Sequence, residues 1–100
     1  MSIERLSIDQ GMKCAKIVEH YGAASQEFQA ISELSELLQV LTRRQDQRGE
    51  DWNDHLFDEL ADVMVMIRQM CCLHGIRYYD LCLHVSEKID RQMKRIANGD

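Results

Sequence analysis

Residues 30–41, AISELSELLQVL, and residues 58–70, DELADVMVMIRQM, decide the fold. Each stretch repeats apolar residues at helical spacing without proline or glycine, so each is predicted to form a long α-helix. Each also contains two acids three positions apart: Glu33 and Glu36 in the first, Glu59 and Asp62 in the second. Side chains three apart on a helix are neighbours, with Cβ atoms roughly 5–6 Å from each other. If the two helices lie antiparallel, the four carboxylates converge.

The converging acids suggest a metal site. Carboxylates held together repel one another unless a cation or protons neutralise them. Carboxylate oxygens suit Mg²⁺ or Mn²⁺, and Mg²⁺ usually binds together with substrate phosphates. The hypothesis is a Mg²⁺-dependent enzyme, with Mn²⁺ as an alternative ion, that acts on a nucleotide polyphosphate.

The apolar setting of these pairs matters more than their spacing. With 17 acidic residues in 100, about three acid pairs at this spacing arise by chance, and the chain has four. The other two, Asp51 with Asp54 and Glu87 with Asp90, lie in a polar connector and on a charged helix. If the first two pairs instead form solvated helix faces, no metal site exists.

Composition bounds the class of protein. One hundred residues correspond to one domain, and the absence of proline with only five glycines favours a single all-α domain over residues 1–100. With a net charge of −5, the chain as a whole lacks the excess of basic residues that a non-specific nucleic-acid binder needs. No apolar run approaches the roughly 20 residues needed to cross a bilayer, and the first ten residues lack a signal-peptide core. A cytoplasmic protein without nucleic-acid or membrane partners is expected.

Four helices are predicted, arranged as a four-helix-type bundle. Their expected ranges are Ser7 or Asp9 to about His20, Ala24 or Ser25 to about Arg44, Asn53 or Asp54 to about His74, and Tyr78 or Tyr79 to about Ala97. Gly22 is a candidate left-handed cap after the first helix. In the polar connector before the third helix, Trp52 has two interpretations: stacking on a base, or packing over the end of the bundle.

The third helix is apolar almost all round, which means that more than one side must be covered. A homo-oligomer, dimer or tetramer, is therefore expected. The four cysteines, Cys14, Cys71, Cys72 and Cys82, form no CxxC pair and are expected to be buried thiols; a zinc site lacks the usual spacing.

The chain resembles the MazG-like all-α nucleoside triphosphate pyrophosphohydrolases. The similarity consists of ExxE, 22 intervening residues and ExxD, together with HYGAASQEFQAISELSELLQVLTR, DELADVMVMIRQM and EKIDRQMKRI, and it covers about residues 17–97. It implies a four-helix-type fold and Mg²⁺-dependent hydrolysis of a nucleoside triphosphate to a monophosphate and pyrophosphate. Two positions depart from the family pattern: Ser32 and Asp58 stand where many members have glutamate directly before each pair.

The resemblance also implies roles for particular residues. Carried over by position, the metal ligands would be Glu33, Glu36, Glu59 and Asp62, and the substrate-binding residues Gln26, Lys88 and, more weakly, Arg91. In the mechanism that we expect, water attacks the α-phosphorus and a carboxylate not fully committed to the metal accepts its proton. Glu36 is our choice for that base.

Other functions stay open at this point. A di-iron carboxylate bundle would need Glu-x-x-His, which does not occur. A non-catalytic helical oligomer or adaptor would use the same helices without the chemistry. A relative acting on phosphoribosyl-ATP or a pyrimidine deoxynucleotide would share the acidic pairs, because base and sugar preference depend on the shape of the pocket. The number of metal ions is also open.

Overall fold

The chain is all-helical in the computed structural model, which describes residues 2–99. Its elements are α1 (Ile3–Tyr21), α2 (Ala23–Thr42), the short 3₁₀ helix η1 (Gln45–Gln47), α3 (Trp52–Leu73) and α4 (Tyr78–Ala97). Over this range there is no strand, so the all-α prediction is confirmed.

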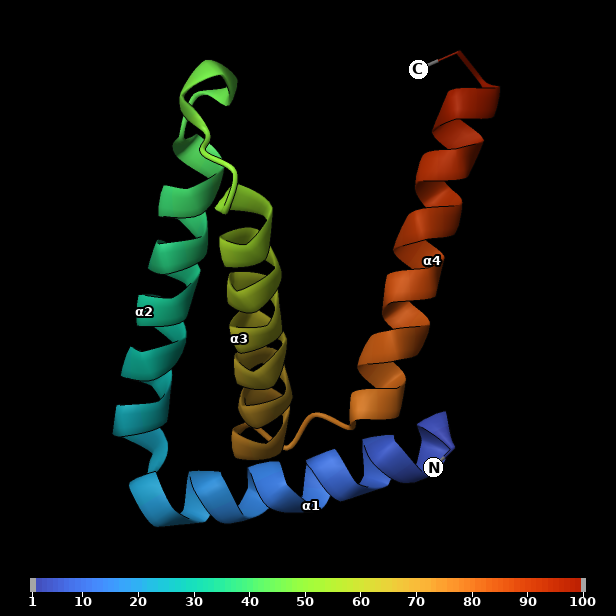
Figure 1. Cartoon of the computed structure of the whole chain (residues 1–100). Helices are drawn as coiled ribbons and strands as arrows, with labels where there is room; N and C mark the ends of the chain where they lie inside the picture. The colour runs from blue at the N-terminus through green and yellow to red at the C-terminus, as the bar shows by residue number, and fades with distance from the viewer. Residues whose placement is uncertain (1, 100) are drawn as a thin grey trace.

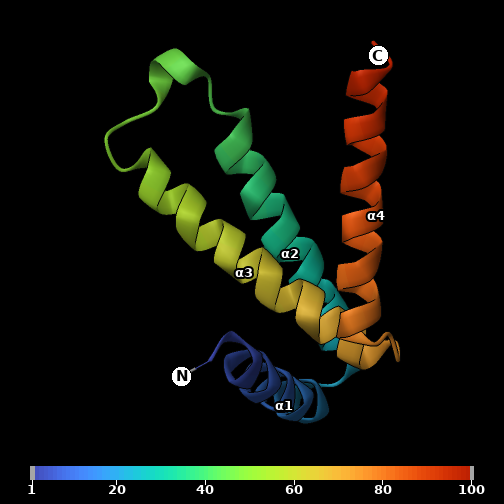
Figure 2. The same cartoon turned by 90° about the vertical axis from the view of Figure 1, so that its right-hand side faces the viewer.

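The helices α2 and α3 form an antiparallel pair, and this pair is the centre of the fold (Figure 1). The helix α1 runs across the end of the pair where α2 begins and α3 finishes. The helix α4 starts at the same end and stands apart from α2 and α3 along most of its length. Figure 2 shows α1 lying below the pair in a second view. Within residues 2–99 the four helices therefore do not close into a bundle.

The start of α1 was predicted too late. The helix begins at Ile3, because the Ser2 hydroxyl accepts a hydrogen bond from the Arg5 backbone N–H at 3.1 Å and so caps the first turn. At its other end Gly22 has φ 87°, which favours glycine, and its N–H donates to the Val18 carbonyl at 2.8 Å. Gly22 thus ends the helix with a positive φ, but its ψ of 165° lies outside the left-handed helical region, so the predicted left-handed cap is confirmed only for φ.

The remaining helix boundaries lie close to the predicted ones. The helix α3 starts at Trp52, one residue before the expected Asn53, and ends where Gly75 has φ 67°. The Ile76 N–H donates to the Cys71 carbonyl at 2.9 Å, which satisfies a carbonyl of the last turn in the manner of a Schellman motif. This tight ending sets the direction in which α4 leaves.

The core is small. Among residues 2–99, six apolar residues are buried, and they come from α1, α2 and α3: Cys14, Val18, Ala30, Val63, Met66 and Cys71. Cys72 and Cys82 are exposed, so the expectation of four buried thiols holds for only two. Between α2 and α3 lies a buried polar pair, in which the Gln69 amide donates to the Gln26 side-chain oxygen at 2.7 Å.

Arg68 connects three helices. From α3 its guanidinium donates to the Ser7 carbonyl at 2.7 Å and to the Ser7 hydroxyl at 3.2 Å, and it lies 3.9 Å from the centre of the Tyr78 ring at the start of α4. Gly11 leaves the space for this side chain, since a Cβ there would lie 2.7 Å from an Arg68 nitrogen. A positive charge stacked on an aromatic face is stabilising.

Much apolar surface is left uncovered within one chain. Along α4 the exposed stripe consists of Val85, Ile89, Met93 and Ile96, and along α2 of Ile31, Leu34, Leu38 and Leu41. Exposed apolar surface on this scale is typical of proteins that bind a partner. Between residues 2 and 99, no helix combines the length and the apolarity that a bilayer crossing requires.

Candidate functional site

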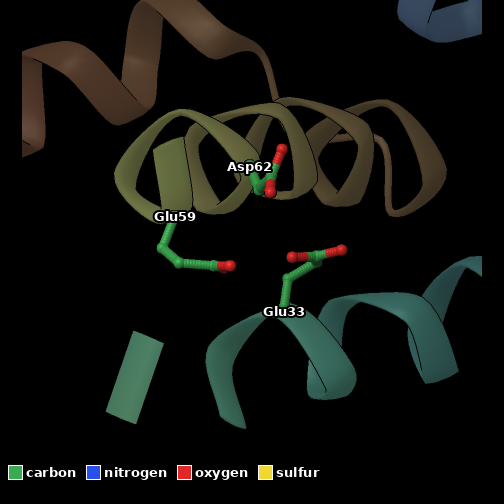
Figure 3. A group of neighbouring side chains, drawn as sticks. All are labelled: Glu33, Glu59 and Asp62. Atoms are coloured by element: carbon green, nitrogen blue, oxygen red, sulfur yellow. The ribbon is translucent and has the colours of Figure 1, made fainter. Parts of the chain in front are cut away.

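Antiparallel packing brings carboxylates from α2 and α3 together. Glu33 projects from α2, while Glu59 and Asp62, one turn apart, project from α3 (Figure 3). One oxygen from each of the three lies within 4.8 Å of the others. All three side chains are half-buried. Three of the four acids predicted to hold metal therefore meet in the space between the two helices.

Two oxygens in this cluster, which we call the acidic cluster (Glu33, Glu59 and Asp62), lack a hydrogen-bond partner. Glu33 accepts from the Gln29 amide through Oε1 at 2.9 Å, but its Oε2 is buried and finds no partner among residues 2–99. The same is true of Glu59 Oε2. A buried polar atom without a partner costs free energy, so both oxygens are suited to bind a cation or a donor that approaches from outside the chain.

The electrostatics of the acidic cluster favour a neutralising cation. Partial burial raises the pKa of Glu59 above its ordinary value, and the nearby carboxylates raise that pKa further: Glu36, Glu33, Asp62 and Asp58. Burial likewise raises the pKa of Asp62, with added contributions from Glu33 and Asp58. Both shifts mean that the ionised carboxylates are disfavoured until a positive charge compensates them.

The donor set fits a hard divalent cation. All three groups offer carboxylate oxygens, which suit Mg²⁺ and Mn²⁺. The three oxygens lie within 4.8 Å of one another, so the same three side chains would be able to hold one such ion. Over residues 2–99, no other group of three or more His, Cys, Asp or Glu side chains has such spacing, so the zinc alternative gains no support.

Glu36 lies close enough to Glu59 to affect its pKa, but it is not one of the three acids whose oxygens lie within 4.8 Å of one another. It is exposed and lies one turn beyond Glu33 on α2. Together with Glu59 it lines a cleft of about 340 Å³ between the end of α2 and the start of α3, whose other lining residues are Gln39, Val40, Arg43, Trp52 and His55. We call this the α2/α3 cleft. Residues 36 and 40 follow helical spacing on α2, residue 43 directly follows the end of α2, and residues 52, 55 and 59 follow helical spacing on α3.

Trp52 forms a fixed wall of the α2/α3 cleft. Its indole N–H donates to the Val40 carbonyl at 2.9 Å, and the Arg48 guanidinium lies 3.8 Å from the centre of its ring. Arg48 also donates to the carbonyls of Arg43 and Leu41, at 3.1 and 3.3 Å. Of the two interpretations of Trp52, packing over the end of the helix pair is therefore observed. The indole nevertheless still lines the cleft.

Gln26 is buried and hydrogen-bonded within the protein. Its side chain is buried and accepts the hydrogen bond from Gln69, near the start of α2 and two turns before Glu33. The Gln69 side-chain oxygen is itself buried, with no partner among residues 2–99. The observed contact of Gln26 is thus to the protein, and its predicted contact with a nucleotide stays a prediction.

Lys88 and Arg91 lie away from the acidic cluster within one chain. Both are exposed on α4, which stands apart from α2 and α3 in Figure 1. Arg91 lines a shallow surface hollow with Glu87, Asp90 and Lys94. Their predicted role in binding substrate phosphates would therefore require α4 of another subunit.

Sequence reasoning missed several residues of the site. Gln29 orients Glu33, and Arg43 and His55 line the α2/α3 cleft. A signal existed for two of them, because Gln29 precedes Glu33 by four positions and His55 precedes Glu59 by four, which places each pair on one helix face. Arg43 gave no such signal, since it lies where α2 ends.

Comparisons of the chain with protein-family models, with curated proteins and with solved structures find no match.

Proposed function

We propose that this protein is a hydrolase that converts a nucleoside triphosphate, or its deoxy form, to a nucleoside monophosphate and pyrophosphate with Mg²⁺. The observation that supports this most is the approach of Glu33, Glu59 and Asp62 within 4.8 Å, with two buried oxygens that lack a partner among residues 2–99. The resemblance of both acidic stretches to the MazG-like family supplies the reaction. The same resemblance leads us to propose a MazG-like domain.

In this proposal Glu33, Glu59 and Asp62 hold the ion. When bound, Mg²⁺ would offset the charge of the polyphosphate and of the pyrophosphate leaving group, and would lower the pKa of water. Glu36 lines the adjoining cleft and stays outside the close triple, which suits a base. It accepts a proton as a water oxygen bonds to the α-phosphorus and the bond from that phosphorus to the bridging oxygen breaks.

We also propose that the working form is a homo-oligomer, a dimer or a tetramer. The exposed apolar stripes of α2 and α4 support an assembly, because a second copy would cover both. Charge supports it as well: α2 has three acidic and no basic residues, whereas Lys88–Ala97 has four basic residues and one acidic. Pairing these helices between subunits would bring Lys88 and Arg91 of the partner subunit toward the substrate phosphates.

The deciding experiment measures pyrophosphate release from a panel of ribo- and deoxynucleoside triphosphates, with Mg²⁺ or with EDTA. Glu59→Gln keeps the size of the side chain and removes its charge, so kcat should fall on the order of 100-fold or more. Glu36→Gln should lower kcat by a comparable factor. Glu19→Gln, an exposed acid on α1, is the matched control and should keep full activity. Near-wild-type release by both site variants would exclude the proposed metal site.

A non-catalytic helical adaptor is the second candidate, and the uncovered apolar stripe of α4 is the observation that favours it. An adaptor would release no pyrophosphate from any nucleotide under either condition. The same panel, extended to phosphoribosyl-ATP and to pyrimidine deoxynucleotides, distinguishes the relatives with other substrates.

A further inference from the structure

The α2/α3 cleft contains groups that metal binding alone does not require. Its acidic side consists of Glu36 and Glu59, while the part nearer the connector has an indole, a guanidinium and an imidazole, from Trp52, Arg43 and His55. A volume of about 340 Å³ lies within the range of small-molecule sites. The cleft therefore joins an acidic end to an aromatic and cationic end.

The aromatic wall is held before any ligand arrives. The hydrogen bond from Trp52 to Val40 fixes the edge of the indole, and Arg48 stacks on the ring while it donates to two carbonyls of the α2 end. A preorganised aromatic surface binds a flat ligand with less loss of conformational freedom. Aromatic side chains stack on nucleobases of any sequence, because every base has a π-face.

Of the two neighbouring arginines at the end of α2, Arg43 and Arg44, only Arg43 is a lining residue of the cleft. Arg43 lines the cleft, whereas Arg44 pairs with Asp46 at 3.0 Å and is not among the lining residues. His55 lines the aromatic end of the cleft, and its Nε2 lies 3.5 Å from Asp51 Oδ2. A guanidinium there can donate to the acceptor atoms of a nucleoside or to its α-phosphate.

We infer that the α2/α3 cleft binds the nucleoside part of the triphosphate, with the base stacked on Trp52, Arg43 donating to the ligand, and the phosphates directed toward Glu59. This inference rests on the proposed function for the identity of the ligand. Trp52 and Arg43 are substrate-binding residues in it, and the acidic cluster is the reacting end.

A second hollow lies beside Gln29, whose amide donates to Glu33. It is lined by Ile17, Tyr21, Ser25, Gln26, Gln29 and Gln69, and its volume is about 360 Å³. None of these residues is basic or acidic, and none belongs to the acidic cluster. A nucleotide placed there would meet no positive charge, so the observations favour the α2/α3 cleft.

The sole tryptophan of the chain gives a direct test. Its fluorescence is measured in Mg²⁺ during titration with an α,β-methylene nucleoside triphosphate, which cannot be cleaved at the α–β bond, and with inorganic tripolyphosphate, which has no base. The analogue should quench or shift Trp52 emission saturably, and tripolyphosphate should leave the emission nearly unchanged. Binding of the analogue, followed by calorimetry, without a change in Trp52 emission would overturn the inference and point to the second hollow.

Matched variants sharpen the test. Arg43→Ala should raise the Kd for the analogue about tenfold, and Arg44→Ala should leave it within about twofold of wild type. By calorimetry, Trp52→Ala should raise the Kd between about 5-fold and 100-fold, and Trp52→Phe should recover part of that loss. Equal effects of Arg43→Ala and Arg44→Ala would contradict the assignment, and this comparison holds even if Trp52→Ala fails to fold.

Failure of the inference can be told apart from failure of the proposed function. Suppose that pyrophosphate is released, but the analogue does not change Trp52 emission and Arg43→Ala does not change its Kd. The hydrolase proposal would then stand, and the proposal that the α2/α3 cleft binds the nucleoside would be refuted. Saturable quenching by the analogue without any pyrophosphate release would support the cleft as a nucleotide site and refute hydrolysis.

Discussion

At the scale of single residues, Glu59 is a side chain whose negative charge the surrounding structure disfavours. Partial burial and four neighbouring carboxylates raise its pKa, and the raised pKa of Asp62 has the same two causes. The folded chain thus places negative charge where the chain alone does not neutralise it. Residues arranged at some cost to stability are frequent at functional sites.

This cost predicts a pH-dependent stability without metal. Because the pKa of Glu59 is higher in the folded than in the unfolded chain, its ionisation opposes folding fully above the folded pKa and not at all below the ordinary value of about 4.3. In EDTA, Glu59→Gln should therefore melt at a higher temperature than wild type near about pH 7.5, and the difference should shrink toward about pH 5.

Thermal unfolding followed by circular dichroism measures this difference. Mg²⁺ should raise the Tm of wild type at about pH 7.5 and should leave Glu59→Gln nearly unchanged. Glu19→Gln, an exposed acid on α1, serves as the control, and its Tm should stay close to wild type at every pH. A stability gain of Glu59→Gln that does not change with pH would contradict the electrostatic origin.

The residues of the site were only partly predictable. Helical spacing, the apolar setting of the two pairs and the assumption of an antiparallel pairing were together enough to expect Glu33, Glu59 and Asp62 to meet. The placement of Arg43 depends on where α2 ends, and that of Lys88 on where α4 lies. Such placements depend on contacts between residues far apart in the sequence, which periodicity does not encode.

At the scale of elements, one side chain on α3 ties together helices that otherwise touch little. Arg68 bonds to Ser7 of α1 and stacks on Tyr78 of α4. The boundaries of α2, α3 and α4 were predictable within about two residues from glycines and the polar connector. The role of Arg68 was not, since an arginine on a helix usually points to solvent.

We predict that Arg68→Ala destabilises the chain. It removes a charge-assisted hydrogen bond to a backbone carbonyl and a cation–π contact, so the free energy of unfolding should fall by about 2–3 kcal/mol. Urea denaturation measures this loss. Lys16→Ala, which removes an exposed basic side chain from α1, should change the free energy by less than about 0.5 kcal/mol. Similar effects of the two variants would mean that Arg68 does not tie the helices together.

At the scale of the whole molecule, the antiparallel pair and α1 surround the small core, while α4 extends away with its apolar stripe uncovered. A core of six buried apolar residues is modest for a chain of this length. Folding and assembly are then expected to be coupled, since a second subunit would cover the surface that one chain leaves open.

The assembly proposal predicts more than a monomer in solution. Sedimentation equilibrium at micromolar concentration should report a dimer or a tetramer. Ile89→Glu, in the middle of the α4 stripe, should weaken association about tenfold or more. Lys16→Gln, on α1, changes the charge by the same amount away from that stripe and should associate like wild type. A strictly monomeric wild type would remove the proposed route by which Lys88 and Arg91 reach the substrate.

The junction between α1 and α2 is a single residue, Gly22. Because the link is a single residue, it fixes how α1 is rotated about its own axis relative to α2. Each residue of an α-helix advances the side chains by about 100° around the axis. Inserting one residue at this junction would turn Cys14 and Val18 off the face that meets α3, so the length of this junction specifies which side of α1 becomes the interior.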